Sequence, residues 1–135
     1  MGRRCYKYYQ PNKKDLKDKY GDCQIRALSK VLNKSWIETY DLTVQINRKF
    51  QINGIFNLPV KERAEALKLL GFEYYGISVR SGNKRPTVEE FAKEHKTGSY
   101  ILNVAHHEVA CVDGIYYDTW DSGKCSLYGY FEYKK

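Results

Sequence analysis

The stretch SYILNVAHHEVACVDGIYYDTW, residues 99–120, decides the fold. It holds three runs rich in β-branched and aromatic residues, a composition typical of strands: SYILNV, HEVACV and IYYDTW. Asp113 and Gly114 separate the second run from the third, and Asp-Gly is a favoured two-residue turn between antiparallel strands. A fourth run, SLYGYFEY, follows at residues 126–133. The last third of the chain is therefore predicted to form an antiparallel sheet.

Upstream of this stretch, helical signals dominate. In GDCQIRALSKVL, Asp22 is a suitable N-cap for a helix that ends near Leu32, with Ile25, Leu28 and Leu32 on its buried stripe. Capping-box spacings at Ser35–Glu38 and Thr87–Glu90 predict two more helix starts.

One more helix and two more strands complete the expected elements. NLPVKERAEALKLLG, residues 57–71, has Pro near its start and Gly at its end, which predicts a helix. Extended segments are expected at residues 3–10 and 72–79. Helices first and an antiparallel sheet afterwards predict a single α+β domain over residues 1–135.

Composition narrows the class of protein. The chain has 135 residues and 42% hydrophobic residues, enough for one core, and a net charge of +7. That charge favours nucleic acid or acidic partners. The N-terminus resembles no secretory signal, and no apolar run is long enough for a membrane span. Four cysteines without metal-site spacing predict reduced thiols, a cytoplasmic location, and no metal or cofactor.

Cys23 is the first candidate for chemistry. It follows the expected N-cap Asp22, so it lies in the first turn of the helix. The partial positive charge at a helix N-terminus favours a thiolate there. The backbone N–H of Cys23 is also unpaired at that position and is available to an oxyanion. A cysteine that only packs in the core would occupy the same position, so a catalytic role for Cys23 requires a second chemical group beside it.

His107 supplies that group, with a carboxylate behind it. His106 and His107 are adjacent in an expected strand and must point to opposite faces, so only one can face Cys23. A two-residue Asp-Gly turn makes His107 and Asp118 diagonal neighbours on one face, whereas a three-residue turn would place His107 opposite Asp121. Trp120 would either cover the His–Asp pair or fill the core.

The two segments that carry these residues have a familiar pattern. GDCQIRALS, residues 21–29, and HEVACVDGIYYDTWD, residues 107–121, resemble the papain-like cysteine peptidases, nearest to the bacteriocin-processing branch. They are also similar to small phage and bacterial proteins with GDCxIRAL and VDGxYYDTWDSG motifs. The resemblance implies that Cys23 is a nucleophile, His107 a general base and Asp118 the acid that orients the imidazole.

The expected oxyanion donor departs from this family. Papain-like enzymes usually carry a Gln about six residues before the nucleophile, a position occupied here by Lys17. The nearest amides upstream are Gln10 and Asn12, of which Gln10 is the expected donor.

Two functions follow from these observations. The first is a thiol hydrolase that cleaves a peptide or isopeptide bond in a peptide or protein substrate. The second is an inactive form of the same fold that uses its basic, Tyr-rich surface to bind nucleic acid or an acidic host protein. A membrane partner is not expected, and the sequence does not predict an oligomeric state.

Overall fold

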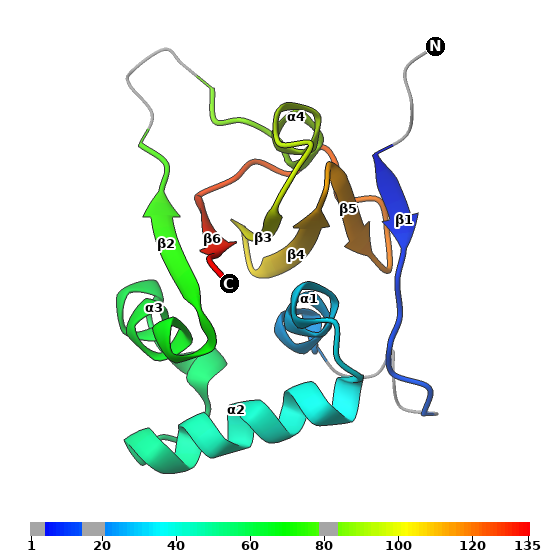
Figure 1. Cartoon of the computed structure of the whole chain (residues 1–135). Helices are drawn as coiled ribbons and strands as arrows, with labels where there is room; N and C mark the ends of the chain where they lie inside the picture. Colours follow the sequence, from blue (N-terminus) through cyan, green and yellow to red (C-terminus); the bar gives the residue numbers. More distant parts are fainter. Residues whose placement is uncertain (1–4, 15–20, 79–83) are drawn as a thin grey trace.

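A computed structural model describes residues 5–14, 21–78 and 84–135. A six-stranded sheet in the order β1-β5-β4-β3-β6-β2 lies between α4 on one face and α1, α2 and α3 on the other (Figure 1). The strands are β1 (Tyr6–Tyr8), β2 (Phe72–Gly76), β3 (Ser99–Val104), β4 (His107–Val112), β5 (Ile115–Asp118) and β6 (Gly129–Tyr133). The predicted α+β architecture is confirmed: N-terminal helices pack on a largely antiparallel, mainly C-terminal sheet.

Two tight turns align the central strands. A two-residue turn joins β3 to β4, with Val104 opposite His107. The next turn joins β4 to β5, with Val112 opposite Ile115. Asp113 and Gly114 in this turn have φ angles of 50° and 80°, as a primed hairpin turn requires. The predicted two-residue turn is therefore confirmed.

The strand β1 adds the N-terminal part of the chain to one edge of this sheet. It pairs with β5 in parallel, with Tyr8 opposite Asp118. The N–H of Tyr9 extends the ladder by donating to the carbonyl oxygen of Asp118, at 2.9 Å. Both segments were expected to be extended, but their pairing joins residues far apart in the sequence.

Four α-helices and two short 3-10 turns complete the described chain. These are α1 (Cys23–Leu32), α2 (Trp36–Phe50), η1 (Ile55–Asn57), α3 (Val60–Leu67), η2 (Lys68–Leu70) and α4 (Val88–Glu94). The capping boxes predicted at the starts of α2 and α4 are both present. No helix in the described part of the chain has the length and apolar character needed to span a bilayer.

The start of α1 differs from the expected cap in one respect. Asp22 occupies the N-cap position, but its side chain makes no capping hydrogen bond. Instead, its carboxylate pairs with Arg26 and accepts a hydrogen bond from the indole of Trp36, at 2.8 Å. Two stronger donors therefore replace the backbone N–H groups that a capping Asp would bind.

Successive residues of β4 divide the core into two clusters. Ala110 packs in a cluster with Leu28 of α1, while Val109 and Cys111 pack in a second cluster with residues of α4. The alternation of side chains along a strand explains this division. The expected stripe on α1 is partly wrong: Leu28 is buried, but Ile25 and Leu32 are only half-buried because the helix turns its Ala27 side toward the sheet.

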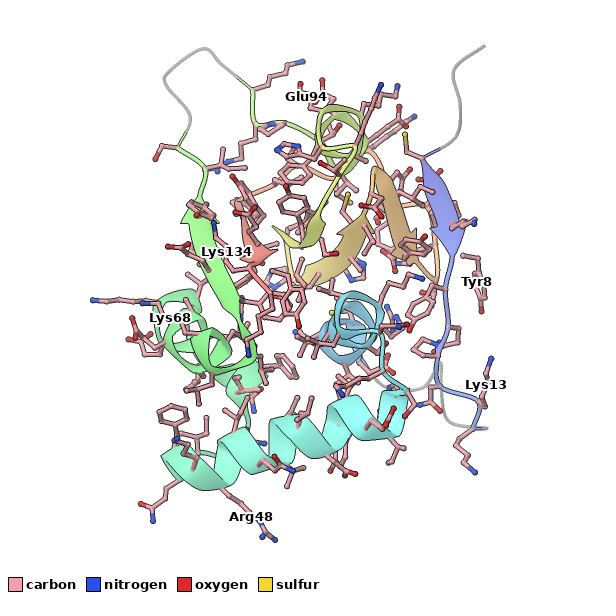
Figure 2. All side chains as sticks on the ribbon, in the orientation of Figure 1. Tyr8, Lys13, Arg48, Lys68, Glu94 and Lys134 are labelled. Atoms are coloured by element: carbon pink, nitrogen blue, oxygen red, sulfur yellow. The ribbon has the colours of Figure 1, made fainter. Side chains whose placement is uncertain are left out.

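Charged side chains occupy the outside of this framework. Lys13, Arg48 and Lys68 extend outward from separate parts of the molecule (Figure 2).

Candidate active site

Three side chains from distant parts of the chain meet at one end of the sheet. Cys23 is the first residue of α1, His107 the first of β4 and Asp118 the last of β5. The Nε2 atom of His107 lies 2.6 Å from Oδ2 of Asp118. The thiol of Cys23 lies close enough to the imidazole to raise its pKa through hydrogen bonding and charge. The structure therefore brings together the three residues that the sequence predicted, with His107 between the other two.

Asp118 is held by several donors. Its side chain is buried, and Oδ2 accepts a second hydrogen bond from the hydroxyl of Ser122, at 2.7 Å. Its Oδ1 accepts the backbone N–H of Thr119 at 2.7 Å and lies 3.5 Å from the guanidinium of Arg26. These contacts fix the orientation of the carboxylate that faces His107.

The protonation of His107 follows from its neighbours. Burial by itself lowers the pKa of His107, but hydrogen bonds to Asp118 and Cys23, with the negative charge of the partners, raise this pKa to about 9. The imidazole is therefore cationic at neutral pH. An imidazolium beside the sulfur of Cys23 stabilises negative charge there, as a nucleophilic thiol requires.

Arg26 links α1 to Asp118. Its guanidinium contacts both Asp22, one residue before Cys23, and Asp118 on β5. The contact with Asp22 joins residues four apart on one helix, whereas the contact with Asp118 is tertiary and was not predicted. A signal existed, because Arg26 lies three residues after Cys23 and hence on the same face of the helix. Ser122 had no comparable signal, since it lies in an irregular segment after β5.

Trp120 covers the imidazole from outside. Its ring centroid lies 5.2 Å from that of His107, and the two planes are tilted by 30°. Because Trp120 is 49% exposed, the prediction that it fills the core is wrong. The alternative holds: one face of the indole shields the ring of His107 from water.

Asp121 does not take the place of Asp118. The phenol of Tyr116 and the backbone N–H of Gly123 both donate to its Oδ1. The observed register of the hairpin also excludes the three-residue turn that would have put His107 opposite Asp121. A Cβ on Gly123 would lie 2.2 Å from the Tyr116 hydroxyl oxygen, so only glycine allows this close approach.

Gln10 lies just beyond β1. It follows Tyr9, whose N–H binds the carbonyl oxygen of Asp118. The side-chain oxygen of Gln10 accepts the N–H of Asn12 at 3.0 Å, so its NH₂ group is the end that could donate to an oxyanion. The role of Gln10 stays a prediction, as does that of Asn12. Lys17, at the usual glutamine position, lies outside the described residues.

Two cavities, each of about 380 Å³, flank Gln24, the residue after Cys23. Gln24 and Phe56 line both cavities. The first cavity reaches His107 and the ends of β3 and β4. The second extends along α2 and includes Tyr40. A peptide lying in both cavities would pass close to Cys23.

All four cysteines, Cys5, Cys23, Cys111 and Cys125, are free thiols. Among residues 5–14, 21–78 and 84–135, no group of three or more His, Cys, Asp or Glu side chains is arranged to hold a metal ion.

Comparison of the chain with protein-family models, with curated proteins and with solved structures found no match. The chemistry of the site is therefore assigned from its own geometry.

Proposed function

We propose that this protein is a thiol hydrolase that cleaves a peptide or isopeptide bond through Cys23, His107 and Asp118. One observation carries the proposal: a half-buried imidazole is hydrogen-bonded to the carboxylate of Asp118 and lies beside the thiol of Cys23, which raises its pKa. A nucleophile, a base and a group that orients the base are the parts that covalent acyl transfer needs.

The steps follow from the protonation of the site. The sulfur of Cys23 attacks the substrate carbonyl, and protonated His107 transfers its proton to the departing amine. A thioester with Cys23 remains. Neutral His107 then takes a proton from water, which attacks the thioester and releases the carboxylic acid; the Cys23 thiolate leaves beside His107, which is protonated again. Asp118 keeps the imidazole in one orientation and stabilises its cationic form in both steps.

The oxyanion of each tetrahedral intermediate needs hydrogen-bond donors. The backbone N–H of Cys23, in the first turn of α1, is one donor at a helix N-terminus. The side-chain NH₂ of Gln10 is the second donor in this proposal.

Two broader expectations belong to the same proposal. The order of a helix opened by Cys, a strand opened by His and a return strand ending in Asp is what the resemblance to papain-like cysteine peptidases implies. We assign the chain to that superfamily as part of the proposal. A cytoplasmic location suits an enzyme with four free thiols, because a reducing compartment preserves its nucleophile.

The test compares wild type with Cys23→Ala in a thiol-directed activity probe and a peptide library read by mass spectrometry. Wild type should react with the probe and cleave a subset of peptides. The Cys23→Ala protein should lose at least about 10⁴-fold in cleavage rate, because no other group can form the thioester.

Cys111→Ala is the matched control, since Cys111 is also a buried cysteine but lies in the sheet. It should keep both activities. Equal probe labelling of wild type and Cys23→Ala, with no peptide cleaved, would refute the proposal and favour a basic binding protein.

A further inference from the structure

The segment that follows β5, residues 119–125, is anchored at both of its ends. Near its start, the carboxylate of Asp121 accepts a hydrogen bond from the phenol of Tyr116. At its end, the carbonyl oxygen of Cys125 accepts the N–H of Val88, the first residue of α4, at 2.9 Å. These contacts fix the path of a segment that begins directly after the acid of the proposed site.

Ser122 is the residue of this segment whose side chain enters the site. It is fully buried, and its hydroxyl lies 2.7 Å from Oδ2 of Asp118. The Nε2 atom of His107 lies 2.6 Å from the same oxygen. An ionised carboxylate only accepts hydrogen bonds, so both neighbours donate to it. Oδ2 is therefore shared between the hydroxyl and the imidazole, whereas Oδ1 faces Thr119 and Arg26.

Sharing this oxygen weakens the hold of Asp118 on the proton of His107. A hydroxyl that donates to a carboxylate oxygen reduces the negative charge available to a second donor there. This matters because the pKa of His107 is already about 9. A general acid works best when its pKa lies near the pH at which it operates, so a stronger hold on the proton would slow its transfer.

Other charged and titratable groups surround the imidazole, and Ser122 differs from them in being uncharged. Two of them, Arg63 and Glu108, form an ion pair and offset one another. The full set consists of Cys23 and Arg26 of α1, Asp118 of β5, Glu108 of β4, Arg63 of α3 and His106 of the turn before β4. Replacing Ser122 changes none of these charges, so its effect on His107 can be measured separately.

We propose that Ser122 is a positioning residue that acts on His107 through Asp118: its hydroxyl takes up part of the charge on Oδ2, so that the imidazolium passes its proton more readily to the departing amine. The proposal rests on the hydrolase proposed above. The proton that moves is the one on Nδ1 of His107, since Nε2 faces Asp118. After the transfer the imidazole is neutral and keeps the proton on Nε2, hydrogen-bonded to Oδ2.

The test measures the pKa of His107 by NMR in protein with ¹³C-labelled histidine, and His107→Ala identifies the resonance. Cys23→Ala protein is used, because the thiol otherwise titrates together with the imidazole. Adding Ser122→Ala should raise the pKa of His107 by at least about half a unit, a threefold increase in proton affinity. If Ser122 only held the carboxylate in place, its loss would weaken the contact with His107 and lower this pKa. A pKa that falls or stays the same overturns the proposal.

Ser126→Ala is the matched control, because Ser126 is an exposed serine farther along the same irregular stretch. It should leave the pKa of His107 unchanged. Ser122→Thr keeps the hydroxyl and should restore the pKa of the starting protein. If circular dichroism shows that the added methyl group prevents folding, Ser122→Cys replaces it. A thiol is a weak donor, so this variant should give a pKa between those of the serine and alanine proteins.

Peptide cleavage separates this proposal from the hydrolase on which it rests. With Cys23 present, Ser122→Ala should move the basic limb of the pH profile of kcat/KM upward by the same amount, and Ser126→Ala should not. A raised pKa of His107 without peptide cleavage by wild type would overturn the hydrolase alone. Cleavage by wild type, with a pKa that Ser122→Ala leaves unmoved or lowers, would overturn the role of Ser122 alone.

Discussion

Two cysteines of this protein are buried to a similar degree and differ in their neighbours. Cys23 is 9% exposed and Cys111 is fully covered. Cys111 lies in the middle of β4 within an apolar cluster, where burial raises its thiol pKa to about 12. Cys23 lies at a helix N-terminus beside His107, which is hydrogen-bonded to Asp118. Burial alone therefore does not identify an inert thiol; the polar groups beside the sulfur decide its chemistry.

The first prediction concerns the largest expected difference between the two thiols, which is their reactivity toward an alkylating reagent. At neutral pH, iodoacetamide should alkylate Cys23 ahead of the other cysteines and leave Cys111 unmodified in the folded protein. His107→Ala should slow alkylation of Cys23 about 10³-fold, because the imidazolium that stabilises the sulfur's charge is gone. Peptide mapping by mass spectrometry gives both rates.

His106→Ala is the control for this substitution, since the neighbouring imidazole is exposed in the turn between β3 and β4. In the His106→Ala protein, Cys23 should be alkylated at the wild-type rate. If His107→Ala also leaves the alkylation rate of Cys23 unchanged, Cys23 and Cys111 differ only in their accessibility to the reagent. His107 then has no effect on the reactivity of Cys23.

The second prediction concerns the pH dependence of stability. The folded-state pKa of His107 is about 9, above its ordinary value of 6.5, so protonation favours the folded protein. This contribution, up to about 3 kcal/mol in the free energy of unfolding, should be fully present below pH 6.5 and lost as the pH rises through 9. Urea unfolding at pH 6 and pH 9.5 measures it.

Asp118→Asn should reduce this pH dependence, since the hydrogen bond and charge of Asp118 raise the pKa of His107. Arg48→Met, a change at a side chain that extends away from the molecule, should leave it unchanged (Figure 2). A wild-type stability that is constant over this range would show that the imidazole is not held as a cation.

The third prediction addresses the smallest effect, that of Arg26. Arg26→Met removes the cation that contacts Asp118, while His107, Ser122 and Thr119 keep their hydrogen bonds to that carboxylate. The alkylation rate of Cys23 should fall by about tenfold, and Cys111 should remain unmodified.

The control for Arg26→Met is Arg48→Met, because Arg48 extends away from the molecule at the far end of α2 (Figure 2). A rate for Arg26→Met equal to that of Arg48→Met would show that Arg26 serves only the structure of α1.

The parts of the site that the sequence predicted depend on local patterns. The Asp-Gly turn sets the register of β4 and β5, and the register places His107 beside Asp118. The position of Cys23 follows in the same way from the start of a helix. Both patterns involve neighbours in the sequence, so they are visible before any tertiary structure is known.

The parts that the sequence did not predict are tertiary. Arg26 meets Asp118 only because α1 packs on the sheet, and Trp36 reaches Asp22 only because α2 folds back beside α1. Because the carboxylate of Asp22 binds this indole and the guanidinium of Arg26, it does not cap α1 as expected. Local sequence patterns predict the conformation of the backbone at a given position. They do not predict which other helix or strand packs beside it, and these partners come from such elements.

The parallel pairing of β1 with β5 has a consequence for when the proposed active site can form during synthesis. The hydroxyl of Tyr6 donates to the carbonyl oxygen of Asp118, 112 residues away. Contacts between such distant residues form slowly, because the intervening chain must first be ordered. A growing chain on the ribosome exposes Cys23 well before His107 and Asp118 have been made. The nascent protein therefore carries a thiol without its base, and in the proposed hydrolase cleavage would begin only after translation has supplied both partners.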